Sequence, residues 1–322
     1  MGVGVKPVWL DYGNPEGQHK LLTNLSAIAW DDTFLWTASD EGRSVECLKP
    51  YRDGFRLHRR FALDDLFLGL PGSESADEID VESMDVVGGR LWVCGSHCTV
   101  RRQAKKTGSL TIDPDLRARK SRRLLGSALL AGILDQAAVG LAMPYSGKDS
   151  LRRRLSNDPY LAPFLNLPGK ENGLDIEGLA VRNRAVLIGL RGPIVDSTAV
   201  VVEFGSEGSG EITPASHRLH FLELEGLGVR DLARWDGSII VLAGPVSSAA
   251  GPFRLYLWNV RRTDKIQRPR QIFEWKEKND APEGICRKGD ELLVVYDTGR
   301  DMSRIQGGRF RADRLVGLLK NA

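Results

Sequence analysis

Residues 175–181 have the sequence DIEGLAV, and four other segments of the chain can be stacked on this one without a gap. Each of these segments is followed by a second apolar run that ends in a polar or glycine-rich turn, as at 185–192. Two apolar runs separated by a turn predict a pair of strands. The related segments are 24–30 (NLSAIAW), 80–86 (DVESMDV), 228–234 (GVRDLAR) and 281–287 (APEGICR).

The spacing of these copies predicts the architecture. Their third residues are separated by 56, 95, 53 and 53 positions. A unit of about 50 residues that begins with a hairpin is typical of a four-stranded propeller blade. We therefore predict an all-β fold, a five-bladed β-propeller that residues 1–322 form as a single domain. The last blade is one strand short, and we expect the N-terminal strand at 6–13 to close it.

The second unit is longer than its neighbours, and we assign the excess to an insertion at 100–169. This insertion is basic at its start, and its composition predicts a helix over 148–165. A sixth blade is the alternative, but no copy of the repeated segment occurs there, which favours five blades. The apolar run at 124–143 has the length of a membrane span. One crossing there would place the blades on opposite sides of a bilayer, so we expect a strand with a packed helix or loop, and no membrane contact.

The charge and cysteine content limit the functional classes. A net charge of +3 argues against a protein built mainly to bind nucleic acid. The basic stretch at 101–123 lacks interleaved aromatic residues, so it favours a solvated loop, with docking of a protein partner as a further hypothesis. The four cysteines lie mostly in apolar strand patterns, and nothing resembling a signal peptide precedes them. We therefore expect a reduced, cytoplasmic setting.

In a propeller the first strand of every blade lines the central channel, so one position taken from each blade forms a ring. Residues at the ends of the second strands, and in adjoining loops, face the same mouth. A polar central site that takes a small anionic substrate or ligand is therefore expected. The ring consists of Ser26, Glu82, Glu177, Arg230 and Glu283. The mouth residues are Asp40, His97, Lys170, Arg191, Asp297 and Arg300.

Crowded glutamates raise one another's pKa, so a divalent cation, Arg230 or shared protons must compensate. Oxygen ligands favour calcium or magnesium over zinc, and calcium suits ligands drawn from separate blades. One hypothesis is a calcium-dependent hydrolase of phosphoanhydrides or phosphate esters. The cation would polarise the phosphoryl oxygen, Arg191 would hold the anion, and Glu177 or His97 would activate water.

A second hypothesis is a non-catalytic binding or scaffold propeller. In that case a Glu/Arg ring, or calcium, would link the blades at the axis. Propellers include both enzymes and non-catalytic binding proteins, so the fold does not decide between the two hypotheses. For His97 the structural interpretation is a ring that satisfies a neighbouring carbonyl group. A glycosidase with two carboxylates across the channel is a third hypothesis, which the scarcity of aromatic residues at the mouth disfavours.

Four segments carry a resemblance to a known family. They are KENGLDIEGLAV (170–181), VLIGLRGPIV (186–195), PEGIC (282–286) and VVYDTG (294–299). The chain resembles, from residue 25 to its end, the bacterial family catalogued as domain of unknown function 3616. This resemblance supports the propeller fold and implies no particular activity.

Other segments are similar to the calcium-activated nucleotidases (apyrases), which are five-bladed propellers. These segments are LSAIAW (25–30), the Glu82 strand followed by LWVCG (91–95), and EGLAV (177–181). In that family serine and glutamate residues from the blades surround a calcium ion. The resemblance implies metal ligands at Ser26, Glu82, Glu177 and Glu283. Arg230 departs from the pattern, and its cation can take the place of the metal. The Glu-Gly phrase is also similar to esterase-like phytase propellers, which implies phosphate esters.

Overall fold

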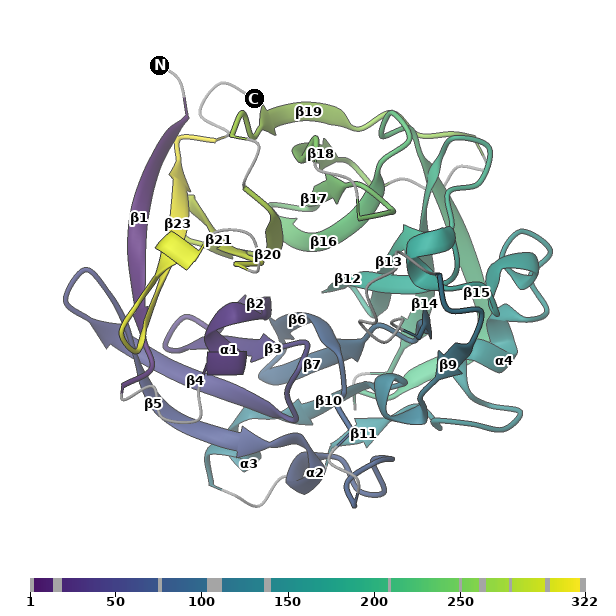
Figure 1. The fold of residues 1–322 in the computed structure, drawn as a ribbon, viewed down its shortest axis with the longest axis horizontal. Helices are drawn as coiled ribbons and strands as arrows, with labels where there is room; N and C mark the ends of the chain where they lie inside the picture. The colour runs from purple at the N-terminus through teal and green to yellow at the C-terminus, as the bar shows by residue number, and fades with distance from the viewer. Residues whose placement is uncertain are drawn as a thin grey trace.

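The computed structural model of the chain describes residues 3–13, 19–74, 77–102, 112–135, 140–207, 210–248, 251–260, 265–277, 280–298 and 302–318. Strands dominate this part of the chain and its helices are short. The predicted all-β fold is confirmed. Figure 1 shows the sheets arranged around a central opening, which is the architecture of a β-propeller.

Two sheets contain four strands each, in chain order from the axis outwards, with all neighbours antiparallel. The first consists of β12 (Asp175–Arg182), β13 (Ala185–Gly192), β14 (Ala199–Ser206) and β15 (Ile212–Leu222). The second consists of β16 (Gly228–Trp235), β17 (Ser238–Gly244), β18 (Arg254–Trp258) and β19 (Arg270–Glu274). Their inner strands are buried along nearly their whole length, because they pack on both faces against neighbouring sheets.

The largest sheet joins the two ends of the chain through β1 (Gly4–Asp11). On one side it contains β2 (Leu25–Trp30), β3 (Leu35–Ser39), β4 (Ser44–Tyr51) and β5 (Gly54–Ala62). On the other side it contains β20 (Pro282–Lys288), β21 (Glu291–Tyr296), β22 (Ile305–Gln306) and β23 (Arg309–Val316).

β1 belongs chiefly to the C-terminal side of this sheet. It pairs antiparallel with β23 over its full length, from Gly4 opposite Val316 to Asp11 opposite Arg309. Its parallel contact with β5 covers only two residue pairs. Leu10, which is paired with residues of both β23 and β5, is fully buried. The N-terminal strand therefore supplies the outer strand of the sheet formed by β20, β21 and β23.

The remaining four-stranded sheet lies in the long second unit. It consists, from the axis outwards, of β6 (Val81–Val87), β7 (Arg90–Gly95), β10 (Leu125–Leu129) and β11 (Leu141–Ala142). The apolar run at 124–143 forms β10, α3 (Leu130–Leu134) and β11. Within the described residues, no helix has the length and apolar character needed to cross a membrane.

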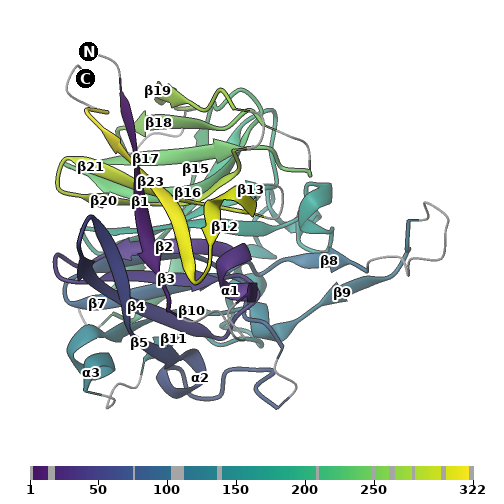
Figure 2. The same cartoon turned by 60° about the vertical axis from the view of Figure 1, so that its left-hand side comes forward.

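The predicted insertion at 100–169 is therefore not one continuous addition, because β10 and β11 complete the sheet. Before them, β8 (Thr99–Arg101) and β9 (Leu116–Ala118) form a hairpin that extends away from the body of the propeller (Figure 2). After them, the helix predicted over 148–165 is much shorter, α4 (Leu151–Leu155), because Pro159 and Pro163 interrupt it.

The other helical segments are connections at the ends of strands. They are α1 (His19–Thr23), α2 (Leu63–Leu66) and the 3₁₀ turns Lys120–Arg122, Ala162–Phe164, Gly169–Glu171 and Met302–Arg304.

The inner strands form a closed ring. β2 contacts β6, β6 contacts β12, β12 contacts β16, β16 contacts β20, and β20 returns to contact β2. Gly284 shows how tight this packing is, because a Cβ atom there would lie 2.5 Å from the Ser26 carbonyl oxygen. Apolar side chains fill the space between neighbouring sheets, and all four cysteines are buried and unpaired. The ring thus fixes one residue of each inner strand relative to the axis.

Candidate functional site

Every inner strand contains a β-bulge at the same position of the repeat. In β12 the partner of Ile176 is Leu190 and the partner of Gly178 is Gly189, so Glu177 has no partner of its own. A bulge leaves one residue outside the ladder and redirects its side chain. The other bulged residues are Ser26, Glu82, Arg230 and Glu283. These are the residues that the sequence predicts for the central ring.

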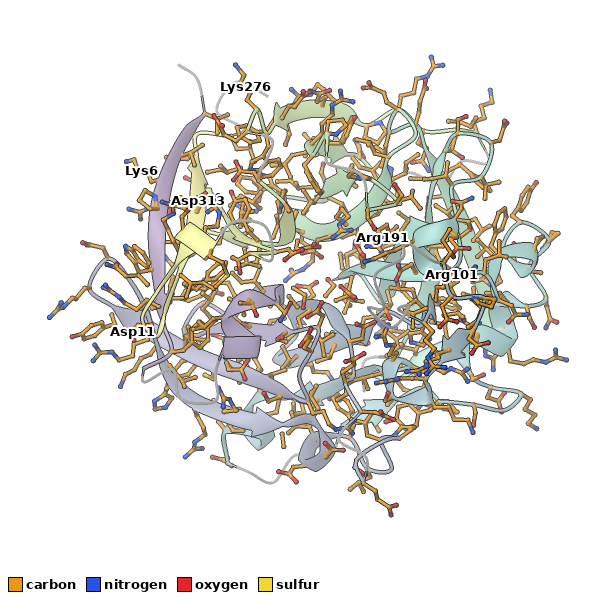
Figure 3. All side chains as sticks on the ribbon, in the orientation of Figure 1. Lys6, Asp11, Arg101, Arg191, Lys276 and Asp313 are labelled. Carbon is orange, nitrogen blue, oxygen red and sulfur yellow. The ribbon has the colours of Figure 1, made fainter. Side chains whose placement is uncertain are left out.

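The bulged residues all line one cavity of about 830 Å³ at the centre of the propeller. Asp40, Arg191, Asp297 and Lys170 line the same cavity. In Figure 3, Arg191 lies beside the central opening, whereas Lys6 and Lys276 lie at the outer edge of the molecule. Arg300 lies outside the described residues. A volume of this size is typical of small-molecule sites.

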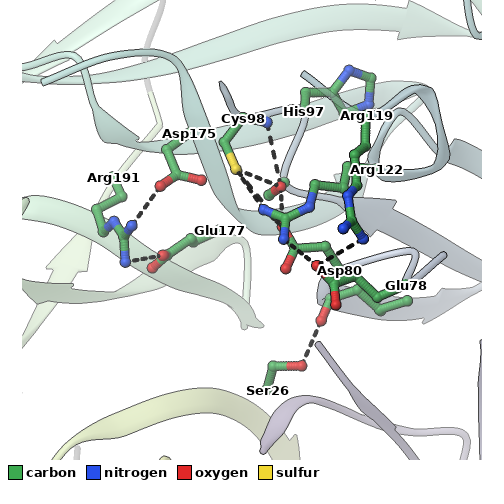
Figure 4. Close-up of polar contacts among 12 residues, drawn as sticks. Ser26, Glu78, Asp80, His97, Cys98, Arg119, Arg122, Asp175, Glu177 and Arg191 are labelled. Atoms are coloured by element: carbon green, nitrogen blue, oxygen red, sulfur yellow. Dashed lines mark hydrogen bonds and ion pairs between the residues drawn. The ribbon is translucent and has the colours of Figure 1, made fainter. Parts of the chain in front are cut away.

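Arginines from two neighbouring sheets hold Glu177 in the cavity wall. The Arg191 guanidinium lies 2.6 Å from one Glu177 oxygen and 2.5 Å from Asp175 Oδ2 (Figure 4). Arg230 Nε lies 2.8 Å from the second Glu177 oxygen, and the same guanidinium also contacts Glu283. The residues of this arginine–carboxylate network come from β12, β13, β16 and β20, so it ties three sheets together at the axis.

Burial sets the electrostatics of this network. Glu177 is 2% exposed and Arg230 is 7% exposed. Burial raises the pKa of Glu177 to about 8, while the charges of Arg191 and Arg230 act in the opposite direction. Loss of either arginine would therefore leave a carboxyl without a counterion in a site that water reaches poorly.

A second group of polar residues lies beside the network, around Arg122. Its guanidinium is 3.0 Å from Asp80 Oδ2 and 3.1 Å from Cys98 Sγ, and it also contacts Glu78. Figure 4 shows these side chains converging on one another. Burial raises the pKa of the Cys98 thiol well above its ordinary value. Cys98 is therefore protonated near neutral pH, and the nucleophilic thiolate form is suppressed.

Two cavity carboxyls differ from the others because they have no counterion. In the part of the chain that the structure describes, neither Asp40 nor Glu82 has a hydrogen-bonding or ion-pair partner for its carboxyl group. Burial, followed by the charges of Asp80 and Glu283, raises the pKa of Asp40 to about 8. Burial and the charges of Asp80, Glu177 and Asp40 raise the pKa of Glu82 well above its ordinary value. Both groups would be stabilised by an added cation.

His97 lies away from the lining of the cavity. Its ring is 3% exposed, and Nε2 lies 3.3 Å from the carbonyl oxygen of Leu124. Burial and the charge of Arg152 lower the pKa of His97 to about 3, so the ring is neutral. This environment corresponds to the structural interpretation of His97, in which the ring satisfies a carbonyl group.

The predicted calcium ligands share the cavity but do not form a fitting donor set. The Ser26 hydroxyl donates to the carbonyl oxygen of Val81, and the Glu177 and Glu283 carboxylates are bound to arginines. Among the described residues, no group of three or more His, Cys, Asp or Glu side chains lies close enough together to hold a metal ion. Arg230 occupies the place in the ring where the resemblance to apyrases implies a metal contact.

Sequence reasoning missed Asp80, Asp175 and Arg122. Asp80 and Asp175 each stand two residues before a ring glutamate, Glu82 and Glu177, so the shared D-x-E spacing was a signal for them. Arg122 carried no signal, because it belongs to the basic stretch of the long second unit and reaches the cavity only through the path of the chain.

The fold and the bulged ring define the class of protein, a β-propeller with a polar central cavity. Residues 24–313 match the model of the family described as "Protein of unknown function (DUF3616)", so the chain belongs to that family. No curated protein matches the chain.

Solved structures with distant similarity include glutaminyl cyclase from Myxococcus xanthus, which is 9% identical with a TM-score of 0.46 and covers 98% of this chain and 97% of its own. The PQQ-bound aldose sugar dehydrogenase from Streptomyces coelicolor is 14% identical with a TM-score of 0.41, covering 98% of each chain. A putative glucose dehydrogenase from Thermus thermophilus is 12% identical with a TM-score of 0.44, covering 98% of this chain and 100% of its own.

Proposed function

We propose that this chain is a five-bladed β-propeller that binds a small polar ligand in its central cavity. The closed ring of β2, β6, β12, β16 and β20, with one bulge in each strand, supports five blades. The largest sheet divides into two blades at the short contact between β1 and β5. The alternative of six blades is disfavoured because β10 and β11 extend the sheet of β6 and β7.

In this proposal the arginine–carboxylate network closes the centre of the propeller in place of a metal ion. The observation that carries it is the double engagement of Glu177, whose two oxygens each lie within 2.8 Å of a different arginine. A divalent cation would have to displace a guanidinium from these carboxylates before it could bind them. The network therefore links the inner strands and leaves Asp40 and Glu82 as the inner-wall carboxyls available to a ligand.

Elemental analysis and thermal unfolding test the metal-free ring. We expect no stoichiometric calcium in the purified protein, and a change in Tm of less than about 1 °C on adding EGTA and then calcium. Stoichiometric calcium together with a fall in Tm on chelation would contradict the proposal. The ligand site is tested by a thermal-shift screen of small polar metabolites against the protein and its Glu82→Arg variant. A ligand that binds in the cavity should change its shift in the variant, because the new guanidinium reverses the charge at one residue of the cavity wall.

Hydrolysis of a phosphoanhydride or phosphate ester is the second candidate function. The raised pKa of Asp40 favours it, because a cavity carboxyl that titrates near pH 8 can donate and accept protons under working conditions. Release of phosphate from ATP, ADP and p-nitrophenyl phosphate, measured with and without calcium, provides the test. A hydrolase should lose turnover in Asp40→Asn and Glu177→Gln while both variants still fold. Equal turnover in the variants and the parent protein would count against it.

A further inference from the structure

The charged groups of the cavity that lack a partner are separated by sign. The inner wall holds Asp40 at the end of β3 and Glu82 at the bulge of β6, both without a counterion among the described residues. The guanidiniums on this wall, from Arg122, Arg191 and Arg230, are all engaged by carboxylates. The inner wall therefore presents two carboxyls that no counterion neutralises, and a bound cation would favour their ionised forms.

The rim of the cavity has the opposite character. Lys170, in the turn before β12, and Arg117, on β9, are exposed and line the cavity. Within the ranges that the structure describes, neither has an ion-pair partner, whereas neighbouring Arg101 is bound to Glu171. A ligand that enters the cavity thus passes free cations at the mouth and meets free carboxyls at the inner wall.

This arrangement disfavours several ligand classes in turn. A phosphate or dicarboxylate would bind only with both Asp40 and Glu82 protonated, whereas a cation stabilises the ionised form of each carboxyl. A bare metal ion lacks a group of three suitable side chains in the described residues. A diamine would satisfy the inner wall but would bring a second cation toward Lys170 and Arg117. A ligand with one cationic and one anionic end satisfies both parts of the cavity.

We infer that the cavity binds a zwitterion of the amino-acid or short-peptide type, an inference that rests on the proposed function. The ammonium or guanidinium group lies against Asp40 and Glu82, and the carboxylate lies toward Lys170 and Arg117. The volume of about 830 Å³ accommodates a molecule of this size and excludes a folded partner. A bulge at Glu82 that turns the side chain toward the axis is the kind of local distortion found beside binding sites.

The test compares ligand classes at equal concentration by thermal shift, followed by calorimetric titration of every compound that gives a shift. The probes are the common amino acids and the dipeptides Lys-Ala and Gly-Gly, the amines agmatine and putrescine, the anions succinate and glucose 6-phosphate, and neutral glucose. We expect binding among the zwitterions, with arginine preferred over agmatine because agmatine lacks the carboxylate.

Variants locate the binding within the cavity. Asp40→Asn and Glu82→Gln should each weaken the best zwitterion at least tenfold, because each removes one carboxylate from the cationic end. Lys170→Ala and Arg117→Ala should reduce the preference for arginine over agmatine at least threefold. Asp65→Asn, which removes an exposed carboxylate of α2 outside the cavity, is the matched control and should leave Kd unchanged. Circular dichroism of each variant establishes that it is folded. If one of the two carboxylate variants does not fold, the other still tests the contact with the cationic end of the ligand.

The possible outcomes separate this inference from the proposed function. Binding of an anion or a sugar that is insensitive to both carboxylate variants overturns the zwitterion but leaves the cavity as a ligand site. Equal binding of arginine and agmatine, unaffected by the rim variants, overturns the role assigned to Lys170 and Arg117. If no class binds, or if Glu82→Arg leaves the binding unchanged, the proposed function itself fails.

Discussion

Replacing Arg230 with methionine would remove the guanidinium from Glu177 and Glu283 while keeping an unbranched apolar stem. Arg230 is 7% exposed, and its side chain contacts both carboxylates. Breaking a buried ion pair by removing one partner costs about 3–5 kcal/mol. With an unfolding entropy of about 2.1 cal/mol/K per residue, this loss corresponds to a fall in Tm of about 4–7 °C for a chain of 322 residues.

Differential scanning calorimetry at pH 7 measures this change, and Arg254→Met provides the matched control. Arg254 also lies 2.8 Å from two carboxylates, those of Glu225 and Glu274, but their side chains are 60% and 42% exposed. Exposed pairs contribute about 0.2–1 kcal/mol each, so the control should lower Tm by less than about 3 °C.

A second substitution separates two contributions to the loss of stability: the lost attraction between Arg230 and its carboxylates, and the cost of leaving a carboxylate without a counterion. Adding Glu283→Gln to Arg230→Met should restore about 1 kcal/mol or more, because it removes the carboxylate that loses its arginine while Glu177 keeps Arg191. If Arg230→Met unfolds no earlier than Arg254→Met, the arginine–carboxylate network does not staple the ring, and the reasoning from burial is wrong.

Three further variants test individual groups. The pKa of Asp40 is about 8 in the folded protein, against an ordinary value of 3.8. Between these two pH values the folded state retains a proton that the unfolded chain loses. The free energy of unfolding therefore falls as pH rises from about 4 to about 8. Asp40→Asn should remove part of that fall, so its free energy of unfolding should rise by about 1–3 kcal/mol relative to the parent between pH 5 and pH 9. Urea unfolding of both proteins at both pH values measures this difference. An equal pH dependence of stability in the two proteins would refute it. His97→Asn should lower Tm yet leave ligand affinity and any turnover within threefold, and a larger loss of turnover would return His97 to a catalytic role. The buried Asp231 side chain accepts hydrogen bonds from Ser83 Oγ at 2.6 Å and from the Ile285 backbone N–H at 2.7 Å. Asp231→Ala should lower the free energy of unfolding, measured in urea, by about 3 kcal/mol. A loss below about 1 kcal/mol would show that these hydrogen bonds do not hold the inner strands together.

The repeated segment was sufficient to locate the inner strands and the residue of each that faces the axis. The reason is that both features are local. A strand pair of fixed length and a bulge at its third residue recur wherever the same short pattern recurs, as Glu82 and Glu177 show. The irregular second unit was less predictable, because its third and fourth strands, β10 and β11, carry no copy of the pattern and were assigned to an insertion.

The sequence by itself therefore determined the all-β fold, the order of the inner strands and the set of ring residues, because these follow from periodic patterns along the chain. Only the tertiary structure decided which arginine neutralises which carboxylate, and which carboxyls remain without a partner. Glu177 and Arg230 are 53 positions apart in the sequence, and Asp40 and Glu82 are 42 apart. Whether such groups pair depends on distances across the axis of a few ångströms, and those distances are set by how neighbouring sheets pack and not by spacing along the chain.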